Sequence, residues 1–210
     1  MKISAPRISA ALEDLSIDDL FAGDLEDAML SNLDATNIHV TSLEMSSVKL
    51  EKVILTASQF ERISARDTHF KQCDLSAVMM ASGAINRAEF SSCRMTGVDL
   101  NKTDLHDVTF ISCKLDMANF RFADLRRVTF NDCTFTETDF IGATLHDVIF
   151  QNCTLERTVF DQVKCKQVDL RTSQLDEIRG WRSLKGAAID DLQLITAAPY
   201  LAHELGIIIK

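Results

Sequence analysis

Uncharged side chains recur at every fifth position from Leu15 to Leu175. These positions hold Leu, Phe, Met, Ile or Val, with the exceptions of Ala35, Ala65 and Cys165. A second uncharged series, mostly Ala, Val, Cys, Thr, Ile or Leu, runs from Gly23 to Ser173, and each of its members lies two positions before a member of the first. Side chains on one face recur about every 3.6 residues in a helix and about every 2 in a strand, so a period of five fits neither. The pattern indicates a repeat architecture, in which each short unit buries its apolar side against its neighbours.

A second period, of twenty residues, lies over the period of five. Phenylalanine recurs at this spacing in two series offset by ten residues, and cysteine and valine each recur in one series. The series are Phe70, Phe90, Phe110, Phe130 and Phe150; Phe120, Phe140 and Phe160; Cys73, Cys93, Cys113, Cys133 and Cys153; and Val108, Val128, Val148 and Val168. If a five-residue unit forms one side of a polygon, four units close a square coil. We therefore predict that equivalent side chains stack coil on coil, with the two phenylalanine series on opposite sides.

The five-residue unit resembles that of pentapeptide-repeat proteins, which is commonly Ala-(Asp/Asn)-Leu-X-X. It stands here as Ala123-Asp124-Leu125-Arg126-Arg127, Ala118-Asn119-Phe120-Arg121-Phe122 and Cys73-Asp74-Leu75-Ser76-Ala77. The resemblance covers roughly residues 15–178. It implies an all-β fold, a right-handed quadrilateral β-helix (a solenoid of about eight 20-residue coils) with a short C-terminal helical cap. Coils that rise by the spacing of paired strands, roughly 4.8 Å, would build a rod about 38 Å long.

Both ends of such a rod need caps, because an open end exposes unpaired backbone and apolar side chains. We expect residues 1–14 to cap the first coil, with Ile3, Ile8 and Leu12 folded over it. Residues 179–210 are expected to form a helical cap. There Asp190 or Asp191 is predicted to cap one helix and Pro199 to start a second. Gly206 would end that helix and leave residues 207–209 as a short apolar strand.

The C-terminal segment carries more apolar residues than one coil end can cover. In some pentapeptide-repeat proteins the C-terminal helix forms a homodimer interface, so the resemblance implies a homodimer here. The candidate dimer interface consists of Leu194, Ile195, Leu201, Leu205, Ile207, Ile208 and Ile209.

Composition narrows the class of protein. A hydrophobic content of 46% excludes a wholly disordered chain. The sequence has no apolar run of membrane-spanning length and no apolar core of a secretion signal near Met1, so we expect no membrane partner. Six cysteines, five of them in the inward series, then favour reduced, buried thiols in the cytoplasm.

Few groups in the sequence suggest chemistry. A column of cysteine sulfurs about 4.8 Å apart leaves disulfides or a thiolate metal column conceivable. Inward thiols in a line do not make a tetrahedron, however, and simple packing is favoured. His106 and His146 fall in one column, but Arg126 between them opposes a shared cation. We predict no enzyme, no catalytic residue, no metal and no cofactor. The alternative, an enzyme or ligand-binding protein, would need a cleft at a cap, near Trp181 and Tyr200.

Two outward groups of residues remain. The column Asp27, Ser47, Asp67, Arg87, Asp107, Arg127, Asp147 and Gln167 alternates in charge from Asp67 to Asp147. We interpret this column as a ladder of exposed cross-strand ion pairs, with a binding site as the less favoured alternative. The outward apolar residues Met117, Phe122 and Ile141 are a possible patch.

The charge of the chain is unevenly distributed. The net charge is −9, yet residues 8–48 contain nine acids and no base, whereas from Lys49 onward 22 acids face 20 bases. A basic partner that docks by charge would therefore dock on the N-terminal coils. The candidate acidic patch is Asp18, Asp19, Asp24, Glu26, Asp27 and Asp34. The alternative is that these acids only keep an exposed end soluble.

The favoured function is that of a non-catalytic interaction protein, a rigid rod that presents flat faces to a macromolecular protein partner. The more specific alternative comes from the resemblance, because some pentapeptide-repeat proteins are thought to imitate DNA and protect DNA gyrase from quinolones. This chain would then modulate a type II topoisomerase, gyrase or topoisomerase IV, and confer quinolone tolerance. Direct binding of nucleic acid is not expected. Plasmid-borne members carry loops that interrupt the period of five, and this chain has none.

Overall fold

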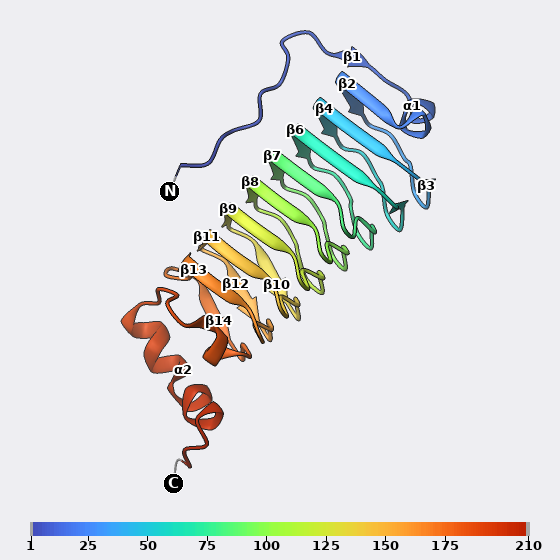
Figure 1. Ribbon diagram of the computed structural model, residues 1–210. Helices are drawn as coiled ribbons and strands as arrows, with labels where there is room; N and C mark the ends of the chain where they lie inside the picture. The colour runs from blue at the N-terminus through green and yellow to red at the C-terminus, as the bar shows by residue number, and fades with distance from the viewer. Residues whose placement is uncertain (1, 209–210) are drawn as a thin grey trace.

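Strands that lie twenty residues apart pair in parallel along the chain and form a β-solenoid of about eight coils (Figure 1). The computed structural model describes residues 2–208. The nine-stranded sheet runs in the order β1 (Glu13–Asp14), β2 (Asp24–Ser31), β4 (Leu43–Glu51), β6 (Ile63–Lys71), β7 (Ala84–Ser91), β8 (Asp104–Ile111), β9 (Asp124–Asn131), β11 (Thr144–Gln151) and β13 (Lys164–Asp169). Two smaller sheets contain β10 (Thr134–Thr136), β12 (Thr154–Glu156) and β14 (Gln174–Asp176), and β3 (His39–Val40) and β5 (Gln59–Phe60).

Each complete coil has four sides. The long strands supply two of them, because each bends at a residue that the pairing skips: His146 pairs with Arg126 and Val148 with Val128, but residue 147 has no partner. The other two sides are joined by short strands or single bridges, again twenty residues apart. Equivalent residues of successive coils therefore lie directly over one another, which confirms the stacking expected from the twenty-residue period.

The corners of the coil use left-handed backbone conformations. These occur two residues after most of the five-residue positions, for example at Asn32 (φ 52°) and Asp67 (φ 54°). Asparagine and aspartate adopt this region more readily than most residues. Met117 and Phe122 also adopt the left-handed conformation, at φ 57° and 58°. The equivalent positions of neighbouring coils, Gly97 and Gly142, hold glycine. The sequence period alone did not reveal this requirement.

The core is a continuous apolar column. Every position of the five-residue series from Leu20 to Leu175 is buried except Cys165, which is half-buried, and Leu15 before them is also half-buried. The rings of Phe70, Phe90, Phe110, Phe130 and Phe150 stack with centroids 4.5–5.0 Å apart. The rings of the second series lie across the core and meet the first edge-on, as Phe140 and Phe150 do at 83°. The two predicted series thus fill opposite sides of one interior.

At the N-terminal end, α1 (Ile17–Ala22) takes part of the place of a coil. Glu13 of β1 pairs with Ala28, only fifteen residues away, so the first turn of the solenoid is short. Leu20 of α1 is fully buried. We expected Ile3, Ile8 and Leu12 to fold over the first coil. Instead, the segment before β1 runs back along the side of the solenoid, and these side chains are only half-buried.

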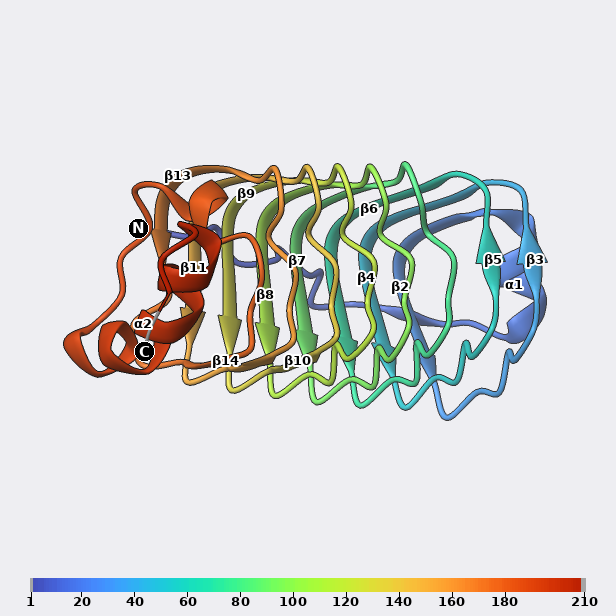
Figure 2. The same ribbon diagram turned by 90° about the horizontal axis from the view of Figure 1, so that it is seen from below.

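At the other end, η1 (Trp181–Leu184) and α2 (Asp191–Glu204) cover the last coil (Figure 2). Asp190 is the N-cap of α2 and accepts a hydrogen bond from the Gln193 N–H. The Gln193 side chain is buried and donates to the carbonyls of Leu170 and Ser173 at 2.7 and 2.6 Å. The predicted cap at Asp190 is confirmed, and its helix seals the solenoid through Gln193.

Two details of this end differ from expectation. Pro199 does not start a second helix but lies inside α2. Proline cannot donate to the carbonyl of Ile195, which is tolerable because Ile195 is 69% exposed and water can reach it. Ile207 and Ile208 form no strand; the Ile207 N–H instead bonds to the Ala202 carbonyl and closes the helix beyond Gly206. Ile209 lies outside the described residues.

Candidate functional site

The acids of the N-terminal coils are mostly exposed but do not all share one face, because Asp34 lies ten residues after Asp24, on the opposite side of the coil. Of the six predicted residues, Asp18, Asp24, Glu26, Asp27 and Asp34 are exposed and Asp19 is half-buried. They come from α1, from β2 and from the side of the coil that follows it. Within residues 2–208 none of the six takes part in an ion pair. None of these charges is therefore neutralised by a direct ion pair, although Arg66 lines the same hollow as Asp24.

Two of the six acids also have local structural roles. The Asp19 carboxylate accepts hydrogen bonds from the backbone and hydroxyl of Ser16 at 2.7 and 2.8 Å, which lowers the pKa of Asp19. Asp34 accepts the hydroxyl and N–H of Thr36, at 2.6 and 3.0 Å, with the same effect on its pKa. Both carboxylates are thus held in the charged form, whereas Asp18, Asp24, Glu26 and Asp27 make no ion pair among the described residues.

Acids in the middle of the rod are in a different state, because many are paired. Carboxylates and bases of the same or neighbouring coils meet along the solenoid. The pairs include Glu51–Lys71, Asp67–Arg87, Asp107–Arg127, Asp124–Arg126, Asp139–Arg121, Glu137–Arg157 and Asp169–Arg171. The surface charge of the middle coils is therefore largely neutralised, and the N-terminal coils stand out.

The alternating column forms two of its predicted rungs. Arg87 binds Asp67 with two bonds, Nε to Oδ1 at 2.7 Å and Nη2 to Oδ2 at 2.6 Å. Arg127 binds Asp107 in the same way, with both bonds at 2.8 Å. Each guanidinium turns back toward the coil before it, so in the described coils Arg87 makes no ion pair with Asp107.

These rungs are not the exposed pairs that we expected. Asp67 and Asp107 are only 8% and 7% exposed. The hydrogen bonds from Arg87 hold the pKa of Asp67 below its usual value, and those from Arg127 do the same for Asp107. Two buried carboxylates, each clamped by an arginine, are thus fixed in the charged form two coils apart.

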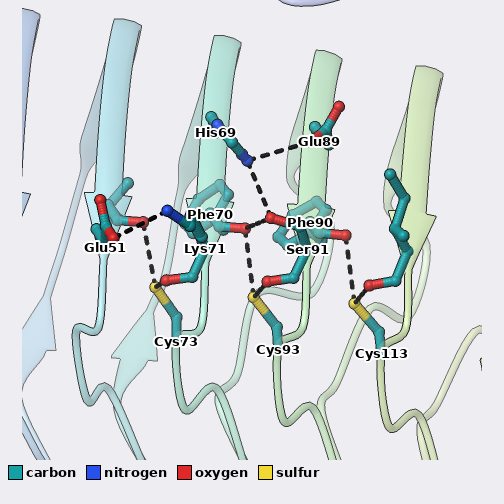
Figure 3. Close-up of polar contacts among 12 residues, drawn as sticks. Glu51, His69, Phe70, Lys71, Cys73, Glu89, Phe90, Ser91, Cys93 and Cys113 are labelled. Carbon is teal, nitrogen blue, oxygen red and sulfur yellow. Dashed lines mark hydrogen bonds and ion pairs between the residues drawn. The ribbon is translucent and has the colours of Figure 1, made fainter.

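The cysteine column lies inside the solenoid, and Figure 3 shows three of its sulfurs in a row. All five thiols are buried, and each contacts the carbonyl of the residue 23 positions earlier at 3.3–3.6 Å. Ser173 continues the column and its hydroxyl donates to the Phe150 carbonyl at 2.9 Å. The cysteine thiols thus make the same contact to a carbonyl as the Ser173 hydroxyl makes one coil later. The contacts support the interpretation as packing with weak hydrogen bonds.

His39, His69 and His146 each pair with one acid. His69 contacts Glu89 at 3.2 Å and Ser91 at 3.0 Å (Figure 3), and His39 contacts Glu61 at 2.9 Å. Across residues 2–208, no three His, Cys, Asp or Glu side chains come together where they could hold a metal ion. In the same range no helix is both long and apolar enough to span a bilayer.

The apolar side chains of the C-terminal segment are exposed. Among the predicted interface residues, Leu194, Ile195, Leu205, Ile207 and Ile208 are 50–81% exposed, whereas Leu201 packs against the core. A second, smaller apolar area lies at mid-rod. There Phe122 is 52% exposed and its ring covers Gly142, where a Cβ atom would lie 2.6 Å from the ring. Met117 is 57% exposed and Ile141 is half-buried.

Trp181 and Tyr200 belong to the C-terminal cap, where an open hollow is lined by Asp161, Arg179, Gly180, Arg182, His203 and Glu204. Trp181 is buried and Tyr200 is 37% exposed. The Glu204 carboxylate accepts the backbone N–H groups of Gly180, Trp181 and Arg182 at 3.0–3.2 Å. This carboxylate caps η1 and fastens the end of α2 to the last coil.

Sequence reasoning missed one set of contacts altogether. Backbone N–H groups of the N-terminal segment bond to the alternating column, from Ser4 to Asp107 and from Arg7 to Asp67. The only signal in the sequence was the column itself. The burial of Asp67 and Asp107 in that column could be recognised only in the folded structure.

Comparison with known proteins gives a family for part of the chain. Residues 103–179 match the model described as a pentapeptide repeat region. No curated protein matches significantly. Among solved structures, a trypsin-treated variant of QnrB1, described as a plasmid-mediated fluoroquinolone resistance protein, is 22% identical over 95% of this chain and 98% of that chain, with a TM-score of 0.49.

A second structure is HetL from Nostoc sp. strain PCC 7120, described as a pentapeptide repeat protein involved in heterocyst differentiation regulation. It is 16% identical over 80% of this chain and 90% of that chain, with a TM-score of 0.32. Likeness at these levels carries no conclusion about a partner. The identification rests on the family model and on the coils themselves, whose twenty-residue register continues on both sides of the matched segment. The chain therefore contains a pentapeptide repeat region, folded as a four-sided β-solenoid.

Proposed function

We propose that the protein is a non-catalytic interaction protein whose acidic N-terminal coils bind a basic surface of a macromolecular partner. The observation that carries this proposal is the contrast in pairing along the rod. Asp18, Asp24, Glu26 and Asp27 are exposed and outside ion pairs, whereas many acids of the middle coils are neutralised by arginine or lysine. An uncompensated field at one end steers a basic partner toward that end.

The solenoid supports this role by fixing the positions of the charges. Asp24 pairs in register with Glu44, and successive strands lie about 4.8 Å apart, so the acids stand on a rigid frame. A rigid surface loses little conformational freedom on binding, which favours affinity. Buried reduced thiols agree with a cytoplasmic location for this protein.

The test compares two matched variants in binding to native lysate. One variant neutralises Asp18, Asp24, Glu26 and Asp27 with Asn or Gln, and the control neutralises the exposed acids Asp104, Asp132, Asp176 and Glu177. Both variants change the net charge by the same amount. We expect that the first loses a partner captured by the wild type and that the control keeps it. Equal capture by all three proteins contradicts the proposal.

A second candidate is a modulator of a type II topoisomerase that presents its acids in place of DNA. The unpaired acids favour it, since duplex DNA carries roughly one charge per 1.7 Å of axis. QnrB1, described as a plasmid-mediated fluoroquinolone resistance protein, is among the solved structures that this chain resembles. Supercoiling by purified gyrase, with and without ciprofloxacin, tests the candidate. Inhibition or protection that disappears in the N-terminal variant supports it, and no effect at micromolar protein removes it.

We also propose that two copies associate through the exposed apolar side chains of α2 and the residues after it. Ile195, Leu205 and Ile208 are 69%, 61% and 81% exposed, while Gln193 and Ala197 on the opposite side of α2 are buried against the last coil. An apolar surface of this kind is typical of interaction sites. Association there leaves the acidic end of each rod free.

A further inference from the structure

The N-terminal segment crosses the coils in an extended conformation (Figure 1). Three of its backbone N–H groups are received by one column of side chains: Ser9 by the Ser47 hydroxyl at 2.8 Å, Arg7 by Asp67 at 2.9 Å, and Ser4 by Asp107 at 3.2 Å. The segment therefore runs along the axis of the solenoid, at right angles to its strands. Its first residues lie on the later coils and its last residues on the earlier ones.

The spacing of the donors matches the spacing of the acceptors. Asp67 and Asp107 lie two coils apart, or about 9.6 Å at the usual separation of strands. Ser4 and Arg7 lie three residues apart, which spans about 10 Å in an extended chain. In a flat β-strand the N–H groups of residues i and i+3 point to opposite sides. In a polyproline II conformation, with three residues per turn and a rise of about 9.3 Å over them, they point to the same side, so an extended peptide of that kind presents an N–H group to each carboxylate.

The two acceptor sites are built alike. In each, the Oδ1 atom that receives the peptide N–H also receives the Nε of an arginine, at 2.7 Å from Arg87 and 2.8 Å from Arg127. The arginine fixes the carboxylate and leaves one direction of Oδ1 for the peptide. A hydrogen bond to a charged acceptor is stronger than one between neutral groups.

The hydrogen bonds to the segment involve its backbone, while the side chains of Ile3, Pro6 and Ile8 are half-buried. The side chains of Ser4, Ala5 and Arg7 are exposed, and Pro6, which has no N–H, lies between the two donors where none is required. Proline also restricts Ala5 to extended conformations. A segment held in this way can be replaced by another of similar backbone conformation.

We propose that the carboxylates of Asp67 and Asp107, each clamped by an arginine, form a track that binds extended peptide backbone. The N-terminal segment occupies the track in cis, and an extended segment of a partner protein displaces it. A suitable partner segment has N–H groups, and hence no proline, at two positions three residues apart. Basic side chains suit it, because Lys2 and Arg7, the only bases before Lys49, both belong to the segment that is bound.

Tethering gives the chain's own segment an advantage over any partner. A short flexible link produces an effective concentration in the millimolar range, so a free peptide competes poorly with the intact segment. Removing the two N–H donors of the chain's own segment should therefore leave the carboxylates of Asp67 and Asp107 available to an added peptide. This inference is independent of the acidic patch proposed above.

The test uses full chains and a fluorescent peptide of residues 2–11. The S4P/R7P variant lacks both N–H donors, and the control S4A/R7A loses the same side chains but keeps the donors. We expect fluorescence anisotropy to show at least tenfold tighter peptide binding by S4P/R7P than by the wild type and by S4A/R7A. A peptide that is N-methylated at the residues equivalent to Ser4 and Arg7 should lose this affinity.

Further measurements make the outcome decisive. Circular dichroism checks that S4P/R7P keeps the solenoid, and hydrogen exchange of residues 8–12 shows whether its segment is released. Adding D67A/D107A to S4P/R7P should abolish peptide binding. The proposal is overturned if S4P/R7P releases its segment without binding the peptide, if the segment stays protected, or if the N-methylated peptide binds equally well.

Discussion

At the scale of single residues, each position in the coil requires a particular type of side chain or backbone conformation. The inward positions need apolar side chains of matched size, and Phe110 shows why. Its ring is fully buried and stacks between Phe90 and Phe130, at 4.8 Å from each. The corner two residues later needs a backbone that accepts positive φ, as Ser112 does at 52°. Apolar and corner residues together define the five-residue unit.

The stacked phenylalanines allow a first prediction. Phe110→Ala should lower the free energy of unfolding by about 3–5 kcal/mol, because it removes a buried ring and leaves a cavity between two others. Urea denaturation measures the change. The exposed Phe122→Ala serves as the control and should cost less than about 1 kcal/mol. Equal losses in both variants would mean that Phe110 does not lie in a packed stack.

The half-buried thiol of Cys165 gives a prediction about pH. Burial raises the pKa of Cys165 to about 11, and only the thiolate reacts with iodoacetamide. In the native protein its alkylation rate should therefore rise about tenfold per pH unit from pH 8 to near pH 11, whereas an ordinary thiol levels off near its pKa of about 8.5. Cys165→Ala identifies the signal by removing it. A plateau near pH 8.5 would contradict the raised pKa.

At the scale of elements, the terminal segments differ most from the coils. The coils repeat one register, whereas α1 shortens the first turn and α2 closes the last. Gln193 joins α2 to the solenoid by two hydrogen bonds, which its side chain donates to the carbonyls of Leu170 and Ser173. The same side chain accepts the N–H of Asp190, the N-cap of α2. The caps are therefore held by individual polar contacts, whereas the coils are held by the repeated hydrogen bonds between paired strands.

This attachment can be tested by replacing Gln193. Gln193→Met keeps the size of the side chain but leaves buried polar groups without a partner, which should lower the stability of the C-terminal cap by about 1–3 kcal/mol. Hydrogen exchange of α2 and β14 measures the loss. Gln174→Met, at an exposed position of β14, should leave exchange unchanged. Identical exchange in the two variants would show that Gln193 does not hold the cap.

The elements also show what could be predicted from the sequence. The inward series from Leu20 to Leu175 and the N-cap at Asp190 followed from side-chain pattern, because burial and capping select residue types. The path of residues 2–9 did not follow from the pattern, because it depends on backbone N–H groups that every residue except proline carries. Pro199 was misleading, since packing of Ala197 and Leu201 continues α2 past it.

At the scale of the whole molecule, the two ends of the rod differ in chemistry. The first coils carry unpaired acids such as Asp24 and Glu26, and the last carries an exposed apolar surface around Ile195 and Leu205. In the coils between the two ends, ion pairs neutralise many of the acids, so the net electrostatic field there is small. We thus propose a basic partner at the first end and a second copy of the chain at the other.

The proposed association of two copies can be measured by sedimentation. The wild-type chain should sediment as a dimer of the 23.4 kDa protomer, and I195D/L205D as a monomer, because charges in an apolar interface prevent its burial. The control M79D, at an apolar residue that is 45% exposed on the side of the rod, should stay dimeric. A monomeric wild type at micromolar concentration would contradict the proposal.

The stacking of one coil directly on the next underlies every site described above, and the sulfur atoms report it directly. Anomalous diffraction from native crystals at long wavelength should show the sulfurs of Cys73, Cys93, Cys113, Cys133 and Cys153 as five peaks in one line, about 4.8 Å apart, inside the molecule. Peaks that are scattered, unevenly spaced or at the surface would contradict the account.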